Sequence, residues 1–338
     1  MKIIGITGTN GKTTTAHIVC ELLQKAGHKA IKIGTITNRL TTPPPWELAK
    51  IFEQAEKRGV EYLVMEVSSH GIQQDRIKGI FFHVKALTNI TRDHLDYHKT
   101  FRAYKKVKSG WLKRGCGIKI YPRDWRKEKI DFIQPYAGHF NKHNVQTALA
   151  VLKALNILPE KKLKKLFAGL SPVPGRFEVI AKKPFTVIID YAHTPDGLAN
   201  LLNAVRELRR KQRSGRIITV FGCGGDRDKG KRPKMGRLVL NQSDLCVVTS
   251  DNPRTEDPAG IIKDILTGMR QNIFGRRRRI SVEPDRRRAI VQAVALAKPG
   301  DFVVLAGKGH ETYQVLGAQK VHFDDHEEIK KALQKWRL

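Results

Sequence analysis

Residues 3–14 read Ile-Ile-Gly-Ile-Thr-Gly-Thr-Asn-Gly-Lys-Thr-Thr, and this stretch decides the fold at the start of the chain. An apolar run followed by a glycine-rich turn that ends in Gly-Lys-Thr is typical of a phosphate-binding loop between a buried strand and a helix. Gly8 and Gly11 let backbone N–H groups approach phosphate oxygens. Lys12 adds positive charge, and the Thr13 hydroxyl is the expected Mg²⁺ ligand. Although the loop lacks the first glycine of the strict eight-residue pattern, we predict a site for ATP or GTP rather than an ordinary strand-to-helix turn.

Length and composition bound the class of protein. The 338 residues suit about two domains, each large enough to fold on apolar burial alone. The opening strand is followed at once by polar residues, so we expect neither a secretory signal nor a membrane span, and we place the protein in the cytoplasm. The cysteines have no Cys-x-x-Cys spacing, so buried free thiols are expected rather than a metal site or disulfides. These cysteines are Cys20, Cys116, Cys223 and Cys246.

The formal charge of +31 is unusual, and arginine runs at 276–279 and 286–288 contribute to it. Such a balance could mark a nucleic-acid surface. The basic residues are spread along the chain, however, and no basic stripe is interleaved with aromatic residues. Because the phosphate loop already points to an anionic ligand, we favour an enzyme for anionic substrates and do not expect nucleic acid as a partner.

Strands and helices alternate along the chain, which predicts a doubly wound, mostly parallel α/β sheet. The first series has strands at 2–7, 30–36, 61–67, 83–88 and 117–121, and helices at 13–26, 45–58, 100–113 and 141–155. Pro-Val-Pro-Gly-Arg at 172–176 predicts a boundary between domains 1–172 and 173–338. A second, Rossmann-like series follows, with strands at 185–190, 216–221, 244–249, 279–282 and 301–305, and helices at 195–211, 231–240, 258–270 and 285–297.

Polar residues follow two of the predicted strands of the first domain. Glu66 ends one apolar strand, and Asp93 and His94 follow another. Open α/β sheets keep their sites at these carboxyl ends, where an acidic residue is well placed to hold Mg²⁺. Taken singly, each could instead be a helix cap or a loop residue. Together with Lys12 and Thr13 they form a candidate site.

Seven motifs are spread over essentially the whole chain. They are Thr-Gly-Thr-Asn-Gly-Lys-Thr-Thr at 7–14, Glu-Val-Ser-Ser-His-Gly at 66–71, Thr-Asn-Ile-Thr-Arg-Asp-His-Leu-Asp-Tyr-His at 88–98, Asp-Tyr-Ala-His-Thr-Pro-Asp at 190–196, Gly-Cys-Gly-Gly-Asp-Arg-Asp-Lys-Gly-Lys-Arg-Pro at 222–233, Asp-Asn-Pro-Arg at 251–254 and Gly-Lys-Gly-His-Glu at 307–311. In these motifs and their order the chain resembles the Mur ligases, the ATP-dependent enzymes that add amino acids to the peptidoglycan precursor. Generic phosphate-loop folds do not share the last four motifs.

The resemblance implies a mechanism. An acceptor carboxylate attacks the γ-phosphate of ATP to give an acyl phosphate, and an incoming amine then displaces phosphate, so negative charge gathers in both steps. It also implies catalysis by Lys12 and two Mg²⁺ ions held by Thr13, Glu66 and His94. A lysine carbamylated by CO2 completes the metal site in the family, and Lys108 matches its place. Its neighbours Lys105 and Lys106 leave a solvated basic face as the alternative.

The resemblance also implies binding residues. The implied nucleotide contacts are Gly8, Thr9, Asn10, Gly11, Lys12, Thr13, Thr14, Asn144, Arg176, Asp190 and His193. The implied contacts of the muramoyl peptide are Thr41, Thr42, Ser68, Gln74 and Arg76, and those of meso-diaminopimelate are Arg227, Asp251, Asn252, Arg254, Gly307 and Glu311. The arginines would pair with a carboxylate and Glu311 with the distal ammonium. A lysine-adding enzyme would leave an arginine at position 254 unpaired.

One departure from the family concerns the acceptor. Family members carry an N-terminal domain that binds the uridine nucleotide, whereas this chain begins at the phosphate loop, and the stretch between residues 108 and 141 is short. The acceptor could be held without uridine contacts, a separate polypeptide could supply them, or the acceptor is not a UDP-sugar.

We expect a monomer. Three functions stay open: a ligase that adds meso-diaminopimelate to a muramoyl dipeptide or a close analogue, an amide ligase for a folate-type or cell-surface polyglutamate acceptor, and a non-catalytic protein that binds anions or nucleic acid.

Overall fold

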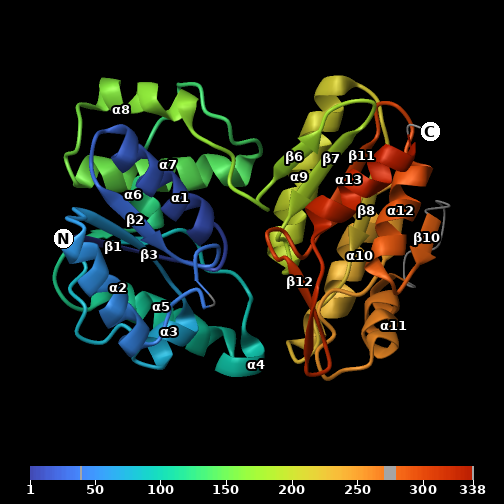
Figure 1. Ribbon diagram of the computed structural model, residues 1–338, viewed down its shortest axis with the longest axis horizontal. Coiled ribbons are helices and arrows are strands. Elements are labelled where there is room, and N and C mark those ends of the chain that lie inside the picture. Colours follow the sequence, from blue (N-terminus) through green and yellow to red (C-terminus); the bar gives the residue numbers. More distant parts are fainter. Residues whose placement is uncertain (39, 270–278, 337–338) are drawn as a thin grey trace. The chain divides into compact units, whose positions relative to one another are not determined.

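The computed structural model describes residues 1–38, 40–269 and 279–336, which form two compact units, Met1–Pro172 and Val173–Leu338. Figure 1 shows that each unit has a central sheet covered by helices on both faces. The predicted fold class, a doubly wound sheet followed by a Rossmann-like unit, is therefore confirmed. The arginine run at 276–278 lies outside the described residues.

The sheet of the first unit has five parallel strands, and their order places the opening strand at its centre. The order is β2 (Ala30–Ile33), β3 (Tyr62–Val67), β1 (Lys2–Thr7), β4 (Val84–Leu87) and β5 (Ile118–Ile120). Because Ile4 and Ile6 are fully buried between neighbouring strands, the apolar run that precedes the phosphate loop is the middle of the core. The chain turns from one side of β1 to the other between β3 and β4, so the loop after β1 lies at the switch point where such sheets bind ligands.

Helices cover both faces of this sheet. On one face α1 packs against α7, and on the other α3 packs against α5. The bounds are α1 (Lys12–Lys25), α2 (Pro45–Lys57), α3 (Ser69–Gln73), α4 (Leu95–His98), α5 (Phe101–Lys113), α6 (Pro122–Trp125), α7 (His139–Ala154) and α8 (Glu160–Leu166). Among the described residues, no helix is long and apolar enough to cross a membrane.

The sheet of the second unit has six strands in the order β10, β9, β8, β11, β7, β6, and only the β6–β7 pair is antiparallel. Every residue of β7, β8 and β11 is buried, as expected for central parallel strands. The strand bounds are β6 (Glu178–Ala181), β7 (Thr186–Asp190), β8 (Ile217–Phe221), β9 (Leu245–Val248), β10 (Arg279–Val282) and β11 (Phe302–Ala306). The helices are α9 (Pro195–Gln212), α10 (Arg232–Gln242), α11 (Pro258–Met269), α12 (Arg286–Leu296) and α13 (Asp325–Trp336).

Several features differ from the sequence expectation. The edge strand β6, the small hairpin of β12 (Tyr313–Leu316) and β13 (Gln319–His322), helix α13 and the short helices α3, α4 and α6 were not predicted. The expectation that all cysteines are buried is wrong for Cys116, which is exposed between two glycines in the turn before β5. Cys20, Cys223 and Cys246 are buried free thiols.

Candidate functional site

The phosphate loop is shaped by two glycines at the carboxyl end of β1. Gly8 has φ +151° and Gly11 has φ +83°, a conformation that side chains disfavour. A Cβ atom at Gly8 would run into Thr88, and one at Gly11 would run into the side-chain oxygen of Asn144. Without side chains at these two positions, the backbone N–H groups of the loop can approach a bound anion. This arrangement fits a nucleotide phosphate.

The neighbouring strand end holds this loop in place. The Asn10 N–H donates to Asn89 Oδ1 at 3.0 Å, and Thr88 Oγ1 donates to Asn10 O at 2.7 Å. Lys12 Nζ lies over the loop, 2.9 Å from Gly8 O and 2.8 Å from Thr9 O. The predicted loop residues are thus assembled around one lysine, while Thr14 is buried in the first turn of α1 and Asn144 is buried on α7.

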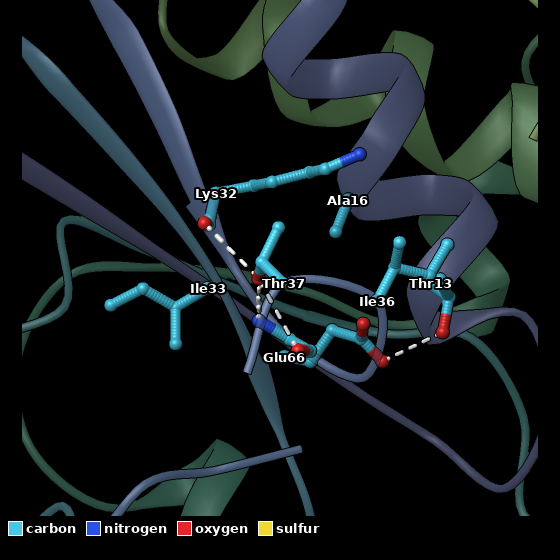
Figure 2. Close-up of a pocket in the computed structure, with 8 residues that line it drawn as sticks. Thr13, Ala16, Lys32, Ile33, Ile36, Thr37 and Glu66 are labelled. Carbon is cyan, nitrogen blue, oxygen red and sulfur yellow. Dashed lines mark hydrogen bonds between the residues drawn. The ribbon is translucent and has the colours of Figure 1, made fainter. Parts of the chain in front are cut away.

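Glu66 and Thr13 face one another beside the loop (Figure 2). The Thr13 hydroxyl donates to Glu66 Oε2 at 2.9 Å, and the Thr35 N–H donates to Glu66 Oε1 at 2.9 Å. Lys32 extends away from this carboxylate toward α1, where its Nζ lies 2.9 Å from His17 Nδ1. Glu66 is thus left facing the loop, and a carboxylate next to a hydroxyl offers the hard oxygen ligands that Mg²⁺ prefers.

This pair does not make a complete metal cage. The described residues contain no group of three or more His, Cys, Asp or Glu side chains that could hold a metal ion. Mg²⁺ in phosphate-transferring sites is usually held by one or two protein oxygens together with substrate phosphates and water. The two side chains therefore fit a Mg²⁺ ion that arrives with a nucleotide.

Lys108 on α5 is buried behind the loop, with 1% of its surface exposed, whereas Lys105 and Lys106 on the same helix are exposed. Its Nζ donates to Thr7 Oγ1 at 3.2 Å and to Gly8 O at 2.9 Å. Burial and then the Lys12 ammonium lower the pKa of Lys108 well below its usual value of 10.5, and Asp93 opposes them. The surroundings of Lys108 therefore disfavour its ammonium form.

His94 lies in the loop before α4 and has a left-handed backbone, with φ +53°. Its Nε2 is 3.3 Å from Asp93 Oδ2. The Tyr104 ring lies 6.2 Å from the His94 ring, and Lys108 Nζ lies 5.3 Å from the same tyrosine ring. Because the Tyr104 hydroxyl also bonds Thr9 Oγ1 at 2.9 Å, one aromatic side chain brings His94, Lys108 and the phosphate loop together.

The residues expected to hold an acceptor peptide form one cluster at the ends of β2 and β3. Thr42 Oγ1 donates to Glu66 O, and its partner Ser68 caps α3. Arg76 Nη1 donates to Thr42 O at 2.7 Å, and its other terminal nitrogen donates to the Gln74 side chain. Thr41 Oγ1 lies 3.0 Å from Thr35 Oγ1. Hydrogen bonds thus link Thr42, Ser68, Gln74 and Arg76 beside Glu66, and Thr41 is linked to Glu66 through Thr35.

In the second unit, Asp190 ends β7 and organises the turn that carries Arg176. Its carboxylate accepts hydrogen bonds from the Phe177 and Ala192 N–H groups at 2.6 and 2.7 Å. Burial raises the pKa of Asp190 to about 6, although the nearby Arg176 guanidinium opposes the shift. Arg176 stacks on the Tyr191 ring at 4.4 Å. His193 Nδ1 lies 2.8 Å from Tyr191 O, so the three predicted residues are brought together around this tyrosine.

A second polar cluster joins the ends of β9 and β11. Asn252 Nδ2 donates to Glu311 Oε2 at 2.9 Å, and Gly307, with φ +117°, places its Cα beside the Asp251 carboxylate. The buried Lys308 ammonium lies between these groups. Lys308 was not predicted as a site residue, although it stands inside the Gly-Lys-Gly-His-Glu motif.

The two arginines expected at this cluster are placed differently. Arg254 has φ +55°, its N–H donates to Val315 O at 3.0 Å, and its Nη1 donates to Gly225 O at 2.8 Å. Its backbone is thereby tied to β12, beside Asn252. Arg227 is exposed and donates to Asp226 O. Within the described residues, no hydrogen bond or ion pair joins Arg227 to the cluster.

Known proteins match the chain over both units. Residues 6–130 match the Mur ligase middle domain, and residues 175–309 match the Mur ligase, glutamate ligase domain. A UDP-N-acetylmuramoyl-L-alanyl-D-glutamate–2,6-diaminopimelate ligase from Gloeobacter violaceus is 42% identical over 100% of this chain and 78% of its own length. A solved structure of a ligase of that name covers 100% of this chain and 79% of its own, at 30% identity and a TM-score of 0.60.

Another protein shares the architecture. A Mycobacterium tuberculosis folylpolyglutamate synthase, solved with ADP, covers 90% of this chain and 87% of its own, with a TM-score of 0.68. Its identity to this chain is 19%, so the likeness shows the fold alone.

Proposed function

The chain belongs to the Mur ligase family, and from that premise we propose that it forms an amide bond between meso-diaminopimelate and a muramoyl dipeptide or a close analogue of that acceptor. As a member of this family it is an ATP-dependent ligase that uses Mg²⁺ and acts on small-molecule substrates. The observation that carries the choice of amino acid is the Asp-Asn-Pro-Arg segment, where Arg254 contacts Asn252 and the Asn252 amide donates to Glu311. The choice of acceptor is supported by the relatives named UDP-N-acetylmuramoyl-L-alanyl-D-glutamate–2,6-diaminopimelate ligase.

In the first step the acceptor carboxylate attacks the γ-phosphorus of ATP. A new P–O bond forms, the bond between the β- and γ-phosphates breaks, and ADP leaves with the electron pair. The loop N–H groups and the Lys12 ammonium would stabilise the charge on the phosphate oxygens. Thr13 and Glu66 would hold Mg²⁺, which neutralises phosphate charge when bound.

Lys108 would take part as a carbamate. Its neutral amine can add to the carbon of CO2, forming an N–C bond and releasing one N–H proton to solvent. The product is an anionic carboxylate at the end of a buried side chain, which can ligate a metal ion as an ammonium group cannot. The lowered pKa of Lys108 and its position behind Gly8 support this role, and His94, near the same Tyr104 ring, would be a further ligand.

In the second step the amine of the incoming amino acid attacks the acyl phosphate. The C–N bond forms through a tetrahedral intermediate, and inorganic phosphate leaves. Arg254 would hold the distal carboxylate of the amino acid, while Glu311, held by the Asn252 amide, would receive its distal ammonium group. The cluster of Thr42, Ser68 and Arg76 would hold the acceptor peptide beside Glu66.

Arg254→Ala tests the choice of amino acid. Loss of a charge-assisted contact with a carboxylate should raise the KM for meso-diaminopimelate by about tenfold to a hundredfold, equivalent to about 1.5–3 kcal/mol. Alanine at φ +55° bears the same backbone strain as arginine, so the fold should be little affected. Arg288→Ala, at an exposed arginine of α12, is the matched control and should leave KM unchanged.

The assay is phosphate release from ATP with and without each amino acid, using a muramoyl dipeptide acceptor. If the wild-type protein prefers lysine to meso-diaminopimelate, or if Arg254→Ala behaves like Arg288→Ala, the assignment is wrong.

A further inference from the structure

Lys308 is fully buried at the carboxyl end of β11. It lies between Gly307, with φ +117°, and Gly309, with φ +55°. A Cβ atom at Gly307 would come within 3.0 Å of Asp251 Oδ2, and one at Gly309 would meet the Tyr191 backbone and side chain. The two glycines thus allow a tight turn in which the lysine side chain is directed into the second unit rather than to solvent.

The Lys308 ammonium lies between two carboxylates and an amide. Its Nζ is 3.3 Å from Glu311 Oε2, 3.3 Å from Asn252 Oδ1 and 3.7 Å from Asp251 Oδ1. Asn252 Oδ1 also accepts the Val315 N–H at 2.9 Å, and Asn252 Nδ2 donates to Glu311. Both ends of the amide are therefore used, and Lys308 contributes to holding Glu311 and Asn252 in one orientation.

The charges of this cluster do not cancel. Arg286 lies near Asp251 but is paired with Asp325, to which it donates two hydrogen bonds, at 2.9 and 2.7 Å. Lys308 is then the buried cation that faces both Asp251 and Glu311. Two carboxylates and one ammonium leave one negative charge in a buried place, where an uncompensated charge is costly.

Two observations support an excess of negative charge. Within the described residues, the buried Oδ1 of Asp251 has no hydrogen-bond partner. Burial, and then the Asp251 carboxylate, raise the pKa of Glu311, whereas burial of Asp251 is outweighed by Lys308 and then Arg286, which lower its pKa. The attraction of Lys308 therefore does not satisfy both acids. One further cation would therefore balance the excess negative charge and would offer Asp251 Oδ1 a hydrogen-bond donor.

We propose that Lys308 is a positioning residue that sets the charge of the amino-acid site: it neutralises one of the carboxylates of Asp251 and Glu311 and orients the other for a single ammonium group of the substrate. The proposal rests on the proposed function, because it concerns the same amino-acid site. Arg254 is not counted in the balance, since it would be neutralised by the distal carboxylate of the substrate. The site would thus select amino acids with a second ammonium group through its net charge as well as its shape.

The test compares meso-diaminopimelate with 2-aminopimelate, which keeps both carboxylates and lacks the second amino group. The wild-type protein, with one net negative charge, should prefer the diamino acid. Asp251→Asn leaves Lys308 and Glu311 to cancel, so the ratio of kcat/KM for the two amino acids should fall by at least about tenfold. Adding Lys308→Met to Asp251→Asn restores one negative charge on Glu311, and the ratio should return to within about threefold of wild type.

Further variants separate a positioning role from a structural one. Lys308→Arg should retain the wild-type preference, and Lys298→Met, at an exposed lysine before β11, should change nothing. The KM for ATP should stay within about twofold of wild type in every folded variant. The proposal would be overturned if the variant with both Asp251→Asn and Lys308→Met had a ratio of kcat/KM for the two amino acids as low as that of Asp251→Asn alone.

Two outcomes keep this test independent of folding and of the proposed function. If neither chain with Lys308→Met folds, Asp251→Asn alone still decides, because an unchanged ratio in that variant would overturn the proposal and a tenfold fall would support it. If the wild-type protein ligates neither amino acid, the proposed function fails first, and the charge of the site is then read from binding of the two acids by calorimetry with the same expected ratios.

Discussion

Lys108 and Lys308 are both buried, with 1% and 0% of their surface exposed, but they lie in opposite surroundings. Lys108, behind the phosphate loop, donates to two neutral oxygens, Thr7 Oγ1 and Gly8 O. Lys308, at the end of β11, lies within 3.3 Å of the Glu311 carboxylate. Burial alone therefore does not decide the chemistry of a lysine; the charge of its neighbours does.

This difference extends to the two sites as a whole. The phosphate loop is built from glycines, hydroxyl groups and backbone N–H groups, and its lysines repel one another, since Lys12 lowers the pKa of Lys108. The second polar cluster, at the ends of β9 and β11, is built from buried charges, with the Arg286–Asp325 pair near Asp251. We therefore expect substitutions in the first site to affect turnover and substitutions behind the second to affect stability.

The largest effect is expected for Asp325→Ala. Asp325 and Arg286 are both fully buried and joined by two hydrogen bonds. Removing the carboxylate leaves a buried guanidinium without its counter-charge, which should lower the free energy of unfolding by about 3–5 kcal/mol. Hydrogen–deuterium exchange of peptides from β11 and α12 measures this loss within the second unit.

Glu327→Ala provides the matched control for that measurement. Glu327 pairs with His322, but the two side chains are 48% and 63% exposed, so the change should stay within about 0.5 kcal/mol. Equal losses in the two variants would mean that the second unit does not depend on its buried charge network, and the contrast between the two sites would disappear.

The phosphate loop of the first site could be predicted from sequence, because it is local. A buried strand, two glycines, a lysine and a threonine stand next to one another in residues 3–14, and the backbone itself supplies the donors. The parallel strands of both sheets were predicted for a similar reason, since continuous apolar runs such as those of β7 and β11 indicate full burial.

The second site could be predicted only in part, because its groups come together through the fold. Lysine, arginine and aspartate usually lie on the surface, so nothing in the sequence showed that Lys308, Arg286 and Asp325 are buried.

The strands that were not predicted lack a sequence pattern of their own. β6 is a four-residue edge strand with a register shift after Val179, so it lacks an alternating pattern. The hairpin of β12 and β13 depends on contacts with Asn252 and Arg254 rather than on a core of its own.

Lys108→Ala should have the next largest effect, and on turnover rather than stability. Without a side chain that can carry the carbamate, kcat should fall by about a hundredfold to a thousandfold, as when one preorganised electrostatic group is lost from an active site. ATP binding should be nearly intact, because Lys12 and the loop N–H groups remain. The measurements are kcat and the Kd for ATP, with Lys105→Ala on the exposed face of α5 as the control.

Bicarbonate gives an independent test of the same role. Removing it from the buffer should lower the activity of the wild-type protein, and adding it back should restore that activity. Lys108→Ala should not respond to bicarbonate. A fully active Lys108→Ala variant would show that this buried lysine is structural. Lys108 and Lys308 would then differ in their surroundings but not in function.

The smallest expected effect is a pH dependence at Glu311. Burial, followed by the Asp251 carboxylate, raises the pKa of Glu311 above its usual value of 4.5, although Lys308 opposes the shift. Only the ionised carboxylate attracts an ammonium group, so the KM for meso-diaminopimelate should rise as the pH falls toward this raised pKa and should be lowest above it. In Glu311→Gln the KM at neutral pH should be higher by about tenfold, and its rise at acid pH should be smaller.

The analogue without the second amino group isolates this effect from other titrations. The KM for 2-aminopimelate should depend little on Glu311, because that acid has no distal ammonium to lose, whereas any change in the α-amine affects both amino acids equally. The ratio of the two KM values therefore reports the charge on the carboxylate itself. A ratio that is flat with pH and the same in Glu311→Gln would place the distal ammonium on Asp251 alone, and Lys308 would then neutralise Glu311, the carboxylate that it approaches more closely.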